Sequence, residues 1–126
     1  MSHTPEHFTV WMEIPVSDLA AGTRFYETVF DTRLNRDESG PQPIMMFPTK
    51  GPEGIAGHLY EGNPASDGTG PTIHLACPDG LEETTERVMQ AGGTVLTPPI
   101  TIPPGRFAYC QDPDGNAISV FEFNTA

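Results

Sequence analysis

The chain has 126 residues, of which 37% are apolar, and its 17 acidic and 6 basic residues give a formal net charge of −11. This length suits one compact domain, and the acidity argues against nucleic-acid and anionic-membrane partners, because phosphate groups are bound by clustered Lys and Arg. No apolar run approaches the roughly 18–20 residues of a membrane-spanning helix, and the polar N-terminal stretch lacks the order of a signal peptide, so we expect a cytoplasmic protein.

The first half of the sequence predicts one strand, one helix and two shorter strands. Apolar and polar residues alternate from Phe8 to Val16, with the period of a half-buried strand. Asp18 is a good helix N-cap residue, and an apolar stripe at helical spacing follows it as far as Phe30. Short apolar runs at 44–48 and 55–60 are further candidate strands.

The second half repeats this order after a linker at residues 63–70, which is rich in Gly, Pro, Asn, Asp and Ser. A helix is expected to begin near Asp79 and to end at Gly92-Gly93. The other expected elements are strands at 72–77, 94–96, 106–111 and 117–123, and a proline-rich loop at 97–105. We therefore expect a single domain, residues 1–126, made of two half-modules at about 1–62 and 71–126.

The two cysteines, Cys77 and Cys110, each lie in an apolar run that reads as a strand. In a chain without a signal peptide, such cysteines are expected to be buried free thiols rather than a disulfide. A nucleophilic role would require a neighbouring His or a helix N-terminus, and Cys77 does precede the expected second helix.

Three segments resemble the vicinal oxygen chelate superfamily, which includes glyoxalases, bleomycin-resistance proteins and extradiol dioxygenases. They are Val16–Leu19 followed by Phe25–Phe30, the helix end Ala91–Gly93, and the turn Asp112–Asn116 before the last strand. The resemblance implies an α+β fold in which two tandem βαβββ modules form a cupped mixed sheet with the helices on its outer side. It also implies a small-molecule cavity inside the cup and assembly as a homodimer.

The resemblance further implies a divalent metal held by His or Glu from the first and last strands of both modules. In this sequence the four positions fall on Trp11, His58, Thr72 and Ser119, of which only His58 is a competent ligand. We therefore expect no metal and no other cofactor. The alternative is an altered divalent-metal site, for which the candidate ligands are Glu13, His58 and His74.

Strand alternation predicts which side chains line the cup. The candidate ligand-binding residues are Trp11, Glu13, His58, Tyr60, Thr72, His74, Ser119 and Phe121. The aromatic members suit an apolar or planar cationic ligand, although the same side chains would also suit a dimer interface or ordinary core packing.

The sequence thus predicts a glyoxalase/bleomycin-resistance-like protein that binds a small molecule without the metal site of its superfamily. The alternatives are a metal-dependent lyase, isomerase or dioxygenase that uses an altered His site, and a noncatalytic interaction module. The sequence identifies neither a ligand nor a catalytic residue. It also leaves open whether the modules pair within one chain or between two chains.

Overall fold

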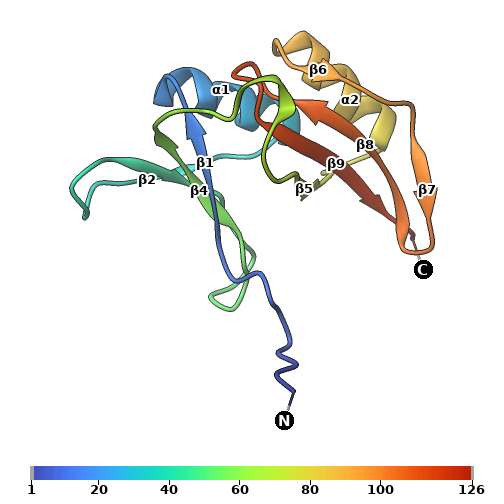
Figure 1. The fold of residues 1–126 in the computed structure, drawn as a ribbon, viewed down its shortest axis with the longest axis horizontal. Coiled ribbons are helices and arrows are strands. Elements are labelled where there is room, and N and C mark those ends of the chain that lie inside the picture. Colours follow the sequence, from blue (N-terminus) through green and yellow to red (C-terminus); the bar gives the residue numbers. More distant parts are fainter. Residues whose placement is uncertain (1, 126) are drawn as a thin grey trace.

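The computed structural model describes residues 2–125, and these form two α-helices and nine strands (Figure 1). The first half contains β1 (Met12–Val16), α1 (Leu19–Phe30), β2 (Asn35–Asp37), β3 (Ile44–Met46) and β4 (Gly57–Glu61). A short 3-10 helix, η1 (Ser66–Gly68), lies between the halves. The second half contains β5 (Ile73–Ala76), α2 (Leu81–Gln90), β6 (Thr94–Val95), β7 (Ile100–Ile102), β8 (Gly105–Gln111) and β9 (Ala117–Phe123).

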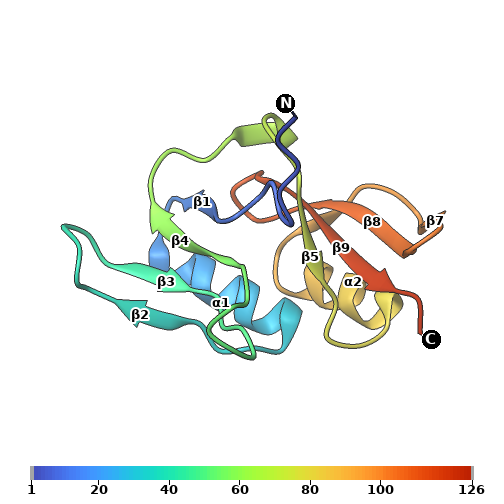
Figure 2. The same cartoon turned by 90° about the horizontal axis from the view of Figure 1, so that it is seen from below.

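The strands are divided between two mixed sheets, which lie on the left and right of Figure 2. The first sheet has the order β1-β4-β3-β2, and the second has the order β5-β9-β8-β6, with β7 also paired to β8. In both sheets the strand before the helix runs parallel to the last strand of its half. The expected α+β fold is therefore confirmed, with β7 as one additional strand in the second half.

The N-terminal strand is shorter than the sequence predicts. Met12 is the first paired residue of β1, because its partner Gly57 is the first residue of β4. Residues 8–11 keep the alternation of a strand, but no strand within residues 2–125 pairs with them. Phe8 and Val10 consequently remain 77% and 67% exposed, in an arm that leads away from the sheets (Figure 1). The predicted strand at 8–11 is therefore wrong for a single copy of the chain.

Two strands escape the sequence prediction, one because it contains no apolar residue and the other because prolines flank its three residues. β2 has the sequence Asn-Arg-Asp and is held by backbone pairing with β3. β7 lies inside the proline-rich loop and pairs with β8 over the register Ile100↔Phe107 to Ile102↔Gly105. Both are short strands at a sheet margin, where backbone hydrogen bonds rather than side-chain burial define the element.

Local sequence explains both ends of α1. The Asp18 carboxylate accepts hydrogen bonds from the amides of Ala20 and Ala21, which would otherwise be unsatisfied at the first turn. Asp31 ends the helix in the left-handed region, at φ 48°. Gly22 allows the helix to approach β1 closely, because a Cβ there would lie 2.9 Å from Cγ1 of Val16.

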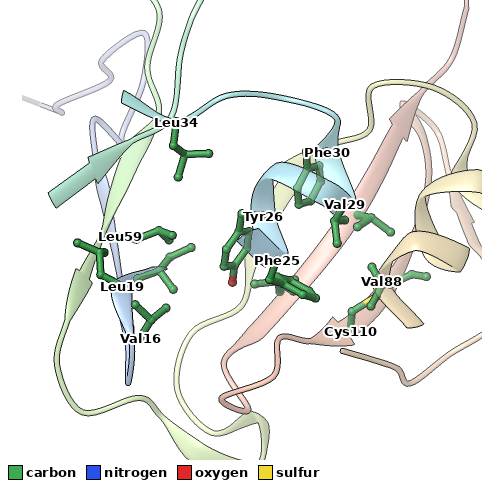
Figure 3. Packing of buried hydrophobic residues seen from close by; sticks show 14 of the residues in the cluster. Val16, Leu19, Phe25, Tyr26, Val29, Phe30, Leu34, Leu59, Val88 and Cys110 are labelled. Carbon is green, nitrogen blue, oxygen red and sulfur yellow. Dashed lines mark hydrogen bonds between the residues drawn. The ribbon is translucent and has the colours of Figure 1, made fainter. Parts of the chain in front are cut away.

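One hydrophobic core connects the two halves. Figure 3 shows side chains of α1 between Val16 and Leu59 of the first sheet and Val88 and Cys110 of α2 and β8. Tyr26 of α1 is fully buried within this core. Each helix also packs on one face of the sheet of its own half. We call the opposite face of each sheet its inner face.

A buried hydrogen-bond network connects the halves at the end of the core. The Tyr26 hydroxyl donates to Oδ2 of Asp112 at 2.7 Å, and Asn116 Nδ2 donates to the same oxygen at 2.8 Å. Asn116 Nδ2 also donates to the Pro15 carbonyl, 101 residues earlier in the chain. The Asp112 Oδ1 atom accepts from the amides of Asp114 and Asn116 and so closes the turn. Burial first, and then the charge of Asp112, raise the pKa of Tyr26 well above its ordinary value.

No helix within residues 2–125 has the length and apolar character needed to cross a bilayer.

Replacing Tyr26 by Phe is expected to lower the free energy of unfolding by about 1–3 kcal/mol at neutral pH, because buried Asp112 loses a donor. Urea denaturation measures this, with Tyr109→Phe as the control, since the hydroxyl of the more exposed Tyr109 makes no hydrogen bond within residues 2–125. Because folding raises the pKa of Tyr26, the stability that its hydroxyl contributes is fully present below the tyrosine pKa of about 10 in the unfolded chain. This contribution declines as the pH rises above that value. The difference between wild type and Tyr26→Phe should therefore narrow above about pH 10. Equal stability of the two Phe variants would contradict this role.

Candidate functional site

The inner face of the first sheet presents a group that we call the His58 group: Trp11, Glu13, His58 and Tyr60. Glu13 lies opposite His58 in the parallel pairing of β1 and β4, and Tyr60 follows two residues later on the same face. The Trp11 indole Nε1 donates to His58 Nδ1 at 2.9 Å, and His58 Nε2 lies 3.3 Å from Oε1 of Glu13. The Tyr60 ring packs edge-on against His58, with a centroid distance of 6.2 Å.

These contacts determine which ring nitrogen of His58 carries the hydrogen. An indole N–H is only a donor, so Nδ1 accepts and Nε2 carries the hydrogen that faces Glu13. Both ring nitrogens are therefore used inside the group. In this arrangement His58 connects Trp11 to Glu13 and has no free lone pair for a metal ion.

The inner face of the second sheet presents the His74 group: His74, Phe107, Tyr109, Ser119 and Phe121. His74 lies opposite Ser119 in the register of β5 and β9, and its Nδ1 lies 2.7 Å from Oγ of Ser119. The three aromatic rings surround the imidazole edge-on, with centroid distances of 5.2 to 6.2 Å. Phe107 and Tyr109 are not among the residues predicted from the sequence, although their alternation along β8 with Ala108 and Cys110 is the signal that identifies this face.

The candidate site residues therefore fall into two groups on different sheets. The hydrogen bonds and ring contacts found in residues 2–125 stay within each group, and none joins His58 to His74. Thr72 precedes β5 and is exposed, and its side chain forms no hydrogen bond with either group within residues 2–125. Over the same residues, no three His, Cys, Asp or Glu side chains come together as metal ligands. The donor set of one chain does not fit the superfamily's metal ion.

A concave region of about 610 Å³, which we call the junction pocket, lies between the two halves. His74, Ala76 and Phe121 of the second sheet form one side. The other walls come from the first half and from the end of β9, namely Met12, Phe30, Thr32, Phe47, Pro48, Thr49, Ile55, Ala56 and Phe123, with Leu75 of β5. Sequence analysis placed Phe30 on a core stripe and Phe47 in a strand, but nothing in their local pattern shows that they share a wall with His74.

A second concave region of about 320 Å³, the acidic pocket, adjoins the His58 group. Glu13, Asp37, His58 and Tyr60 line it, together with the loop at residues 39–42. Hydrogen bonds from Ser39 hold the pKa of Asp37 below its ordinary value, so this carboxylate is charged at neutral pH. The pocket therefore disfavours anionic groups.

Neither cysteine has the lowered pKa of an activated thiol. Both are free, as expected, but Cys77 is only half-buried, whereas Cys110 is buried. Burial raises the pKa of both thiols, that of Cys110 to about 11, so neither is a thiolate at neutral pH.

Comparisons with known proteins agree with this architecture. A family model described as the Glyoxalase/Bleomycin resistance protein/Dioxygenase superfamily matches residues 5–120. Among solved structures, a glyoxalase/bleomycin resistance protein from Albidiferax ferrireducens T118 has a TM-score of 0.68 and 21% identity, over 94% of this chain and all of that one. A glyoxalase/bleomycin resistance protein from Streptomyces sp. CB03234 has a TM-score of 0.64 and 26% identity, over 88% of this chain and 96% of that one.

The antibiotic binding protein TnmS3, also from Streptomyces sp. CB03234, has a TM-score of 0.64 and 24% identity, over 97% of this chain and all of TnmS3. A search of curated proteins finds no significant match.

Because Trp11 is the only tryptophan, its fluorescence reports directly on the His58 group. His58→Ala is expected to shift the emission maximum to longer wavelength and to increase quenching by acrylamide, since the indole N–H loses its partner. His74→Ala is the matched control and should leave the spectrum unchanged. A shift of similar size in both variants would contradict the separation of the two groups.

Proposed function

This chain belongs to the Glyoxalase/Bleomycin resistance protein/Dioxygenase superfamily, and we propose that it is a small-molecule binding protein of that superfamily which holds its ligand in the junction pocket without a metal ion. The observation that carries the proposal is the pocket itself. Its volume of about 610 Å³ lies within the usual range for small-molecule sites, about 300–1,000 Å³. Its walls are mainly aromatic and aliphatic, and His74 is one of few polar groups in them, as is typical of such sites.

Residue chemistry supports the metal-free form of the proposal. By the resemblance in sequence, the superfamily's ligand positions in the first strands fall on Trp11 and Thr72, and neither is a ligand of the expected kind. Ser119 stands at the position in the last strand where the superfamily carries a carboxylate, and its hydroxyl is engaged by His74. His58 has both ring nitrogens occupied by Trp11 and Glu13.

The charge of the chain and one structural relative support a ligand that is not anionic. A net charge of −11 creates a field that repels anions and attracts cations. TnmS3, which shares the fold, is described as an antibiotic binding protein. We infer a neutral or cationic aromatic compound as the ligand class of this chain.

We also propose that the functional unit is a homodimer, as the superfamily resemblance implies. Within residues 2–125, β1 pairs only with β4, so the first sheet has an open edge next to the arm that precedes β1. The arm holds Phe8 and Val10, both exposed and both on the alternating apolar positions of a strand. Pairing of the arms of two copies would cover these side chains through one two-fold axis and leave the β5 residues of the junction pocket accessible.

The binding proposal is tested with N-phenyl-1-naphthylamine, a neutral fluorophore whose emission rises in apolar sites. Wild-type protein should bind it, and Ala76→Phe should weaken binding by at least about tenfold, because Ala76 lines the pocket and the larger ring would fill it. Ala20→Phe is the matched control on the exposed surface of α1. EDTA should not change the affinity, and purified protein incubated with zinc, nickel, manganese and ferrous iron should retain no metal. Near one metal ion per chain, or equal affinities of the two Phe variants, would overturn the proposal.

Light scattering tests the dimer proposal. Wild type is expected at twice the chain mass of 13.6 kDa. Val10→Asp should shift the distribution to monomer, because it places a carboxylate in the apolar set of the arm. Gln90→Asp adds the same charge on the exposed side of α2 and should leave the dimer intact. A monomeric wild type at micromolar concentration would show that the arms do not pair in this way.

A further inference from the structure

The hydrogen-bonded pair of Ser119 and His74 has a defined direction. Ser119 is 0% exposed, so its hydroxyl hydrogen needs an acceptor inside the protein. The only hydrogen-bond partner of Ser119 Oγ within residues 2–125 is Nδ1 of His74, at 2.7 Å. If Nδ1 carried the hydrogen, the buried hydroxyl hydrogen would have no acceptor, and burying an unsatisfied donor is unfavourable. The hydroxyl therefore donates, and Nδ1 accepts.

Donation from the Ser119 hydroxyl to Nδ1 also determines the role of Nε2, the other ring nitrogen of His74. In a neutral imidazole whose Nδ1 accepts, Nε2 carries the hydrogen and is a donor. Nε2 of His74 has no hydrogen-bond partner among residues 2–125. His74 is nevertheless held in place, because Phe107, Tyr109 and Phe121 contact its ring edge-on. The second sheet thus presents, on an exposed side chain, one oriented N–H donor that no group within residues 2–125 engages.

The surroundings of this donor limit the ligand it suits. His74 lines the junction pocket beside Phe121, and the rings of Phe30, Phe47 and Phe123 form further walls. Such walls suit a planar aromatic body, and an N–H donor suits an acceptor atom on that body. A carboxylate would accept well but is opposed by the net charge of −11, whereas a neutral carbonyl oxygen accepts without that opposition.

We propose that His74 Nε2 donates to the carbonyl oxygen of a neutral, planar aromatic ligand in the junction pocket, and that Ser119 is the positioning residue that keeps this hydrogen on Nε2. This inference rests on the proposed binding function and names the ligand class of the same site. It assigns a role to the serine that stands where the superfamily resemblance implies a metal-binding carboxylate.

A matched pair of compounds tests the inference on the unmodified protein. 2-Acetylnaphthalene and 2-ethylnaphthalene share a ring system and differ by a carbonyl in place of a methylene group. Dissociation constants are measured by NMR titration of protein labelled with ¹⁵N at histidine. The ketone should bind about threefold to tenfold more tightly, which is the range for one neutral hydrogen bond. The His74 Nε2–H signal should shift with the ketone and not with the hydrocarbon.

Two variants separate the donor from the residue that positions it. His74→Phe keeps an aromatic ring but removes the donor, so the two compounds should bind equally. In Ser119→Ala the ¹⁵N shifts of His74 should change from the Nε2–H tautomer to a mixture of tautomers, and the preference for the ketone should shrink. Ser17→Ala is the control, because it also removes a serine hydroxyl hydrogen bond, to Asp114, outside the pocket. Its tautomer signals and its preference should match those of wild type.

The inference about His74 and the proposed binding function can fail separately, and the measurements distinguish the two cases. Equal binding of both compounds to wild type would overturn the inference and leave the proposed binding function standing. Binding of neither compound, together with no binding of N-phenyl-1-naphthylamine, would overturn both. An Nδ1–H tautomer in wild type would contradict the role of Ser119 directly.

Discussion

The arrangement of this protein depends on the buried hydrogen bond between Tyr26 of α1 and Asp112 of the turn between β8 and β9. The Asp112 carboxylate accepts from Tyr26, from the Asn116 side chain and from two amides of its own turn. A charge can be buried only when such donors surround it, so the turn, the helix and β1 must all be in place together. Ser17, which donates to Asp114, adds a further contact between the halves at the surface. The relative position of the two sheets follows from this network and from the core beside it.

The relative position of the two sheets determines which side chains each sheet presents on its inner face. Because the helices and the shared core occupy one face of each sheet, polar and aromatic side chains collect on the inner faces. The two inner faces are chemically different. The His58 group is closed on itself, with both imidazole nitrogens satisfied by Trp11 and Glu13. In the His74 group, which borders the apolar junction pocket, Nε2 of His74 has no partner within residues 2–125. Ion pairs from Arg106 to Glu82 and Glu122 lie on the helix side of the second sheet and keep that arginine out of the pocket.

The sequence predicts those parts of the fold in which buried residues recur at regular spacing along the chain. The stripe of α1, the Asp18 cap and the turn at 112–116 predict their elements correctly, because each is a local pattern with a local cause. The start of β1 was not predictable, because the alternation of Phe8 and Val10 continues past the point where β4 can pair with it. Inner-face membership of Glu13, His58, His74 and Ser119 also follows from alternation. Their division into two groups does not, because it depends on the spacing of two sheets that only tertiary packing sets.

The same Tyr26–Asp112 bond has a consequence for synthesis of the chain. The two residues are 86 positions apart, so at 5–20 residues per second the helix is made roughly 4 to 17 s before its partner exists. During that interval Phe25, Tyr26 and Val29 have only the first sheet to pack on, and the faces that will meet α2 and β8 are open to water. Contacts of such sequence separation also slow the final folding step, since loop closure must precede any gain from the contact. The nascent first half is therefore a stage at which chaperones and competing associations have access to surfaces that the finished protein never exposes.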